Sequence, residues 1–122
     1  MYIKIISILL MLFTVYSVNA QSEIIGKWKN ENSGSIIEIY KQNNLFYGKI
    51  IKVSGNEPKE KVGHLLLDKL TFNTTTGKYT GKVNSTTGMT ADCELELINQ
   101  NRFKMTVTKL FIKKTQIFVR TE

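Results

Sequence analysis

The sequence predicts an all-β protein, an eight-stranded antiparallel up-and-down barrel that follows an N-terminal signal peptide. Three observations lead to this fold class. After residue 20, no segment repeats its apolar residues at the helical period. Eight short runs rich in β-branched and aromatic residues recur instead, separated by clusters of Gly, Asn, Ser and Thr. Consecutive hairpins place sequence neighbours side by side, and closing the sheet removes its two unpaired edges.

The first 20 residues have the pattern of a secretory signal. Lys4 supplies an early positive charge, the run 5–18 is apolar, and the triplet at 18–20 ends in the alanine that signal peptidase reads. The apolar run is shorter than the roughly 20 residues that span a bilayer, which disfavours the alternative of an uncleaved anchor helix. We therefore expect an exported, periplasmic or extracellular protein. After cleavage of the signal peptide 1–20, residues 21–122 would form one barrel domain that does not span a membrane.

The first three strands are predicted at Ile24–Asn30, Ser35–Gln42 and Leu45–Val53. In the first, period-two alternation places Trp28 on one face and lysines on the other. The second is apolar on both faces, so the orientation of Glu38 towards lumen or solvent stays open. The third follows a two-asparagine hairpin turn, since asparagine tolerates a positive φ.

The other five strands come after the longest irregular segment, Ser54–Gly63, which is either a lid at a barrel mouth or a plain connection. The sixth strand has the clearest alternation, with Cys93 and its apolar partners facing inward and three carboxylates facing solvent. The predicted bounds are His64–Phe72, Lys78–Asn84, Met89–Ile98, Arg102–Leu110 and Lys113–Thr121.

The formal net charge is +7, but the basic residues are spread over most segments. Only Lys109, Lys113 and Lys114 cluster, and they lack the grouped stacking aromatics of nucleic-acid-binding domains. The composition therefore predicts a solvated basic surface and no specific nucleic-acid partner. Cys93 is the single cysteine, which excludes an intramolecular disulfide. It is predicted as a buried core residue, with an intermolecular disulfide as the alternative.

The sequence contains no recognisable catalytic constellation. His64 is the only histidine, and neither it nor Cys93 has partners at the spacing that a metal site or a nucleophile–base pair needs. Asp92, Glu94 and Glu96 share the outward face of one strand, where a solvated surface is the simpler interpretation. We therefore expect no enzyme activity, no metal and no cofactor.

Gly26, Trp28 and Arg120 are predicted to close the barrel. A tryptophan on the inner face of the first strand can plug one end, and a glycine two residues earlier lets the backbone cross that end closely. In a closed barrel the last strand lies beside the first, so Arg120 comes within reach of the indole face. A Gly-x-Trp on the first strand with a basic residue on the last resembles the lipocalin-type, or calycin, signature.

Further segments resemble a family of short secreted bacterial proteins that is defined only as a domain of unknown function. The resemblance covers nearly all of residues 21–122. The matching segments are Ile25–Trp28, Glu38–Lys41, Phe46–Ile50, Tyr79–Val83, Gly88 with Cys93, and Thr115-Gln116 leading to Arg120. The sequence departs from the family at Phe118, usually Trp, and at Ala91, usually Tyr. The resemblance implies a lipocalin-like β-barrel outside the cytoplasm and no agreed activity.

Two functions fit these observations. The first is non-catalytic binding of a small apolar or amphipathic ligand inside the barrel. Its candidate ligand-binding residues are all aromatic: Trp28, Tyr40, Tyr47, Phe72, Tyr79 and Phe103. The alternative is an interaction or structural module that binds a cell-envelope protein and has a filled barrel. That module would show an exposed apolar patch on its outer surface, near Ile36, Ile51 or Phe111.

Overall fold

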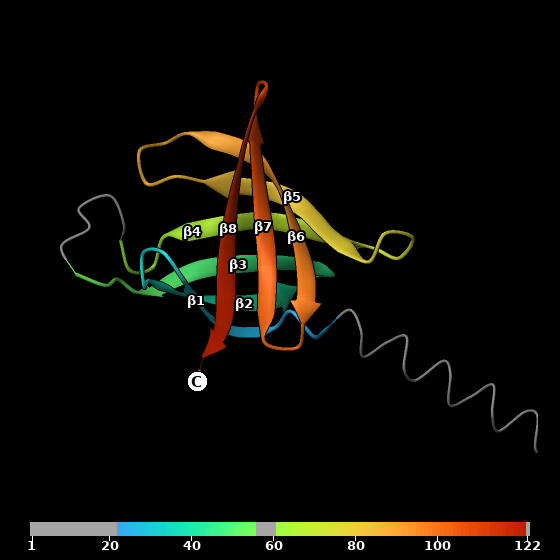
Figure 1. Cartoon of the computed structure of the whole chain (residues 1–122), viewed down its shortest axis with the longest axis horizontal. Coiled ribbons are helices and arrows are strands. Elements are labelled where there is room, and N and C mark those ends of the chain that lie inside the picture. The colour runs from blue at the N-terminus through green and yellow to red at the C-terminus, as the bar shows by residue number, and fades with distance from the viewer. Residues whose placement is uncertain (1–21, 56–60, 122) are drawn as a thin grey trace, which may run out of the picture.

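The computed structural model describes residues 22–55 and 61–121, and all eight predicted strands lie within them (Figure 1). One strand has the predicted bounds, five differ from the prediction by one or two residues at one end, and β4 and β6 differ by one residue at both ends. The predicted signal peptide and the centre of the predicted loop at 54–63 lie outside the described residues. None of the described residues belongs to a helix long and apolar enough to cross a membrane. The strands are β1 Gly26–Asn30, β2 Ile36–Gln42, β3 Leu45–Lys52, β4 Leu65–Asn73, β5 Lys78–Asn84, β6 Thr90–Asn99, β7 Arg102–Lys109 and β8 Ile112–Thr121.

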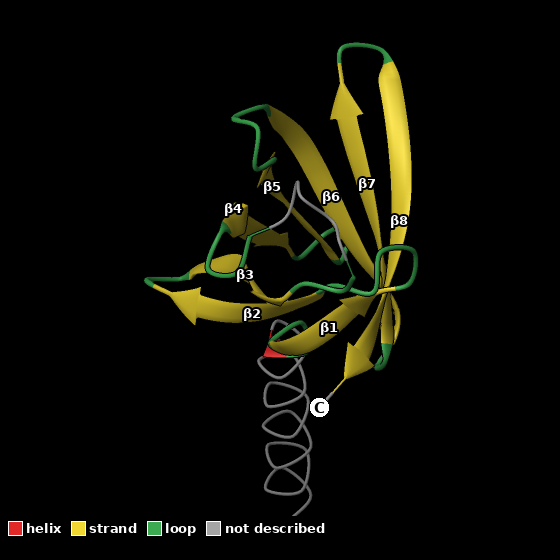
Figure 2. Ribbon diagram, turned by 90° about the vertical axis from the view of Figure 1, so that its left-hand side faces the viewer, coloured by secondary structure: helices red, strands yellow, loops and turns green. Residues whose placement is uncertain are grey.

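The strands form one closed antiparallel barrel. Each strand pairs with its neighbour in sequence, and β8 pairs back with β1, where Trp28 lies opposite Arg120. The predicted eight-stranded up-and-down barrel is therefore confirmed. The β7–β8 hairpin rises well beyond the other strands at one end of the barrel (Figure 2).

Period-two alternation decides which side chains fill the barrel. In β6, Cys93 and Leu95 are buried, whereas Asp92 and Glu94 occupy the outward face. The same alternation holds around the barrel, so one continuous apolar core forms inside it. Its largest fully buried side chains are Trp28, Tyr79, Phe46, Phe103, Phe118, Ile24, Ile37, Ile39, Leu67, Leu70, Leu95 and Met105.

The orientation of Glu38, which the sequence leaves open, is outward. Its neighbours Ile37 and Ile39 are each 1% exposed and face the core, so Glu38 takes the opposite face of β2. Its register partner on β3 is Lys49, a favourable cross-strand charge pairing at the surface. Glu38 is therefore not a buried carboxylate inside the lumen.

A bulge in β4 allows the barrel wall to bend. The register between β4 and β5 shifts in this region, and Lys69 takes a φ of 52°. Gly81 on β5 lies directly against the bulge. A Cβ at that position would come within 2.8 and 2.9 Å of the carbonyl oxygens of Asp68 and Lys69. Only glycine fits there, which lets the two strands pack closely where the sheet curves.

Candidate functional site

One end of the barrel is filled by aromatic side chains. Trp28 is fully buried there, and its indole N–H donates a hydrogen bond to the carbonyl of Ile24 at 2.9 Å. The ring of Phe103 meets the Trp28 ring edge-on with centroids 4.7 Å apart, and Phe118 stacks on Phe103 at 4.8 Å. These contacts close this end with packed side chains.

Arg120 covers the outside of the same end. Its guanidinium carbon lies 4.2 Å from the centroid of the Trp28 ring, a cation–π contact. Gly26 makes room for it, because a Cβ there would lie 2.6 Å from a guanidinium nitrogen and the φ of +141° disfavours any other residue. The guanidinium also donates to three backbone carbonyls, those of Gln100 at 2.9 Å, Ile25 at 3.0 Å and Glu23 at 2.6 Å.

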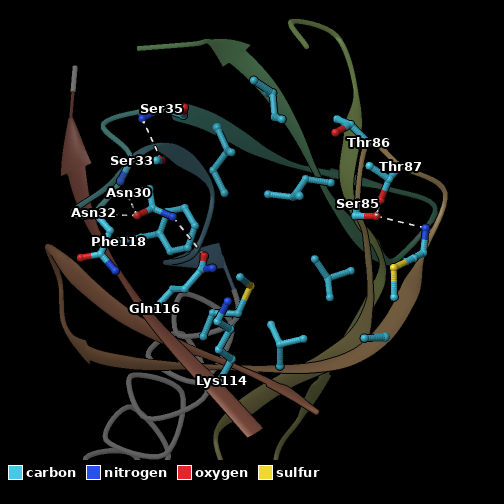
Figure 3. Close-up of a pocket in the computed structure, with 18 of the residues that line it drawn as sticks. Asn30, Asn32, Ser33, Ser35, Ser85, Thr86, Thr87, Lys114, Gln116 and Phe118 are labelled. Atoms are coloured by element: carbon cyan, nitrogen blue, oxygen red, sulfur yellow. Dashed lines mark hydrogen bonds between the residues drawn. The ribbon is translucent and has the colours of Figure 1, made fainter. Parts of the chain in front are cut away.

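The other end of the barrel holds a cavity of about 660 Å³, to which all eight strands contribute (Figure 3). Space remains because the inward side chains near this end are mostly aliphatic and smaller than the rings at the closed end. The apolar part of the lining consists of Ile37, Ile50, Leu66, Val83, Ala91, Met105, Val107 and Phe118, with Met89 near the turn. The polar part consists of Asn30, Asn32, Ser33, Ser35, Ser85, Thr86, Thr87, Thr90, Lys109, Lys114 and Gln116.

The lining changes from apolar to cationic along a single hairpin. The inward side chains of β7 and β8 lie opposite one another and lead from the closed end to the mouth. In that order, the pairs are Phe103 with Phe118, Met105 with Gln116, and Val107 with Lys114, and Lys109 follows Val107 on the same face of β7. A molecule aligned with the barrel axis would meet an apolar interior at one end and ammonium groups at the other.

Asn30 organises the polar rim on the β1 side. Its Nδ2 donates to Oε1 of Gln116 at 3.0 Å, and its Oδ1 accepts from the backbone N–H groups of Asn32 at 2.8 Å and Ser33 at 3.2 Å. Figure 3 shows this network beside the cavity. Asn30 is not among the site residues predicted from the sequence, although an asparagine at a strand end before a polar turn is typical of this local hydrogen-bonding pattern.

The charge of the cavity comes from two lysines. Lys109 and Lys114 are the charged side chains in the lining described above, which includes no aspartate or glutamate. Neither lysine forms an ion pair with another described residue. Figure 3 shows Lys114 and Gln116 side by side on the β8 wall. The mouth therefore carries a local positive charge that no carboxylate in the lining compensates.

The six aromatic residues predicted to line the cavity lie elsewhere. The rings in the filled part of the barrel are Trp28, Tyr79 and Phe103, all fully buried. Phe72 packs against Tyr79 with centroids 4.9 Å apart. Tyr40 and Tyr47 stack on each other at 5.8 Å on the outer face, since alternation in β2 and β3 turns their neighbours inward. None of the six rings is among the residues that line this cavity, and smaller side chains line it.

Cys93 and His64 are the cysteine and the histidine of the chain, and the structure defines the surroundings of each. Burial, with a smaller contribution from Asp92, raises the pKa of the Cys93 thiol to about 12, so the thiol stays protonated at neutral pH. His64 bonds through Nε2 to the backbone carbonyl of Asn84 at 2.8 Å. Within 22–55 and 61–121, no three His, Cys, Asp or Glu side chains group as metal ligands would.

The fold and the site together define a class: a small closed β-barrel that is packed at one end and has a cavity open at the other. The chain belongs to a bacterial family described as "Uncharacterized protein conserved in bacteria (DUF2147)". The family model matches residues 26–120, which run from the start of β1 almost to the end of β8. No curated protein and no solved structure matches the chain.

Proposed function

We propose that the barrel binds, without catalysis, a small anionic amphiphile: an alkyl chain in the apolar part of the cavity and an acidic head group at the mouth. The observation that carries this proposal is the change from aliphatic lining to Lys109 and Lys114 along one hairpin. A cavity of about 660 Å³ falls within the roughly 300–1,000 Å³ of small-molecule sites. Its presence disfavours the alternative of a wholly filled barrel that acts only as an interaction module.

The apolar interior supplies the affinity in this proposal. Each methylene group moved from water to an apolar site contributes about 0.8 kcal/mol. Two additional methylene groups therefore contribute about 1.6 kcal/mol, or roughly a tenfold tighter dissociation constant. This dependence on chain length should hold until the alkyl chain reaches the packed rings of Trp28 and Phe103.

The mouth supplies the selectivity for an acidic head group. Lys109 and Lys114 are exposed, so each contributes no more than about 1 kcal/mol to an ion pair, and salt weakens that contribution. The rim formed by Asn30 and Gln116 is already hydrogen-bonded, so the polar groups there need little rearrangement. An alcohol or a quaternary ammonium of equal chain length should therefore bind less tightly than a carboxylate.

We expect decanoate to bind about tenfold more tightly than octanoate, and more tightly than decanol or decyltrimethylammonium. Isothermal titration calorimetry at low ionic strength measures these affinities. Replacing Lys109 and Lys114 by glutamine should weaken decanoate binding about tenfold and leave decanol binding unchanged, because only the anion interacts with the ammonium groups. Binding that is independent of chain length would contradict the proposal.

A matched pair of variants distinguishes the cavity from the outer surface. Ala91 lines the cavity, so Ala91→Phe fills it and should abolish binding. Thr115 lies on β8 between Lys114 and Gln116 but faces outward, so Thr115→Phe should bind decanoate as the unchanged protein does. If both variants bind equally well, the ligand is not in the barrel.

We also propose that this binding takes place outside the cytoplasm. The support is the signal-peptide pattern at residues 1–20, with Lys4 before an apolar run and a small residue at position 20. N-terminal sequencing of the protein recovered from the envelope of its own cells should begin at Gln21. A chain that still begins at Met1 in the cytoplasmic fraction would overturn this part of the proposal.

A further inference from the structure

The tip of the β7–β8 hairpin exposes three consecutive apolar side chains. Leu110, Phe111 and Ile112 are 86%, 101% and 72% exposed. The hairpin that carries them projects beyond the rest of the barrel, so none of the other strands covers the tip (Figure 1 and Figure 2). The other described large apolar residues on the surface occur singly along the chain, at Ile25, Val62, Met89 and Ile98. The tip is therefore the place where exposed apolar side chains are concentrated.

The residues at this tip are not those that a tight turn prefers. Lys109 pairs with Ile112, so Leu110 and Phe111 form a two-residue hairpin loop. Leu110 takes a φ of 57°, in the left-handed region that favours Asn and Gly. The β2–β3 turn of the same barrel follows that preference with Asn43-Asn44, at φ 52° and 66°. Because a polar turn would fold more easily here, the apolar side chains at the tip need an explanation other than folding.

A basic collar lies directly below the apolar tip. Lys109, Lys113 and Lys114 flank the three apolar residues, and all three lysines are exposed. The whole hairpin, from Arg102 to Thr121, contains no acidic residue. Apolar and aromatic side chains next to lysines are typical of segments that enter the interface of an anionic bilayer, where the ring reaches the acyl boundary and the ammonium groups meet phosphates.

We propose that the β7–β8 tip docks this protein onto the surface of an anionic phospholipid bilayer. Leu110, Phe111 and Ile112 insert at the interface, and the basic collar contacts the lipid phosphates. This inference goes beyond the proposed ligand binding and does not depend on it, since it uses the exposed tip and not the apolar interior. If both hold, docking brings the mouth of the cavity towards the bilayer, because Lys109 and Lys114 belong to the collar and to the cavity lining.

The test is co-sedimentation of the protein, from residue 21 onward, with two kinds of vesicle. One is phosphatidylcholine alone, and the other is phosphatidylcholine mixed with phosphatidylglycerol in equal parts. We expect binding to the mixed vesicles and little to phosphatidylcholine alone. Each lysine of the collar should contribute about fivefold to the affinity, so Lys109→Gln, Lys113→Gln and Lys114→Gln together should abolish the difference between the two vesicles.

The apolar tip is tested by a variant whose two loop residues are those that tight hairpin turns prefer. Leu110→Asn with Phe111→Gly installs the most favoured two-residue turn and removes two of the three apolar side chains. We expect this variant to keep the barrel and to lose more than tenfold in affinity for the mixed vesicles. The matched control is Ile98→Ser, which removes an exposed apolar side chain elsewhere and should bind as before.

Three results would overturn the docking proposal. The first is equal vesicle binding by the Leu110→Asn, Phe111→Gly variant and the unchanged protein. The second is no binding to either vesicle. The third is tip-dependent dimerisation in analytical ultracentrifugation without vesicle binding, which would assign the tip to a second copy of the chain. Decanoate titration of the tip variant separates the two proposals, since vesicle docking alone should be lost.

Discussion

Replacing Trp28 by alanine is expected to lower the free energy of unfolding by about 3–5 kcal/mol. The indole is fully buried, packs edge-on against Phe103, lies beneath Arg120 and donates a hydrogen bond to the Ile24 carbonyl. Alanine would leave a void at the packed end and an unpaired carbonyl. Small domains are stable by only about 5–15 kcal/mol, so the variant should be largely unfolded at modest urea concentrations. Urea unfolding followed by far-UV circular dichroism measures the change.

Two further variants separate the packing of Trp28 from the closure by Arg120. Trp28→Phe keeps a ring and should cost less than the alanine variant, although it loses the N–H donor. Arg120→Lys keeps the charge but loses the planar fork that bonds three backbone carbonyls, so it should also destabilise the barrel. A double-mutant cycle between Trp28 and Arg120 should show a coupling of about 0.5–2 kcal/mol. If the free energy of unfolding of Trp28→Ala lies within about 1 kcal/mol of that of the unchanged protein, the packed end is not what stabilises the barrel.

The barrel is expected to lose stability steeply in alkaline solution. Burial raises the pKa of Tyr79 to about 12 from an ordinary value of 10.0, and that of Cys93 to about 12 from 9.0. The Tyr79 phenol and the Cys93 thiol are neutral when protonated, and each ionises more readily in the unfolded chain than inside the barrel. Their contribution to stability is therefore complete below pH 9 and is lost as the pH rises from 9 towards 12. Where both groups contribute, the free energy of unfolding falls by about 2.7 kcal/mol per pH unit.

Urea unfolding at a series of pH values, followed by the fluorescence of Trp28, measures this loss. Cys93→Ala removes one of the two acids from the core and should reduce the slope above pH 9. The matched comparison is Tyr47→Phe, which removes a phenol from the outer face instead of an acid from the core. A free energy of unfolding that stays constant between pH 9 and pH 12 would show that the two groups ionise as readily inside the barrel as in the unfolded chain.

The strands of this fold can be predicted from the sequence because one face of each strand is buried. The alternation around Cys93 in β6 predicts a strand and its inner face, since a shift of one residue would expose the whole apolar set. Gly26, Trp28 and Arg120 are identifiable for a related reason, because each is needed where the first and last strands meet. Closure itself follows from eight consecutive hairpins, which leave two edges to be paired.

The cavity could not be located from sequence, because its position depends on summed side-chain volumes across all eight strands. Tyr40 and Tyr47 belong to strands that are apolar on both faces, so alternation alone could not show that their rings lie outside. The two ends differ because Phe103 and Trp28 meet at one, whereas Ala91 and Val107 face the other. A gradient from large to small inward residues along β6 and β7 was a usable signal, but only once the register between strands is known.

Methionine methyl NMR tests the central claim, a ligand cavity in the open end of the barrel, most directly. Residues 21–122 contain two methionines, Met89 and Met105, and both line the cavity, one exposed near the turn and the other buried. We predict that decanoate shifts the Met105 methyl resonance saturably, with the dissociation constant found by calorimetry. The resonance of the Trp28 indole N–H, at the closed end, should not shift. Two unmoved methionine resonances at saturating decanoate would contradict the account.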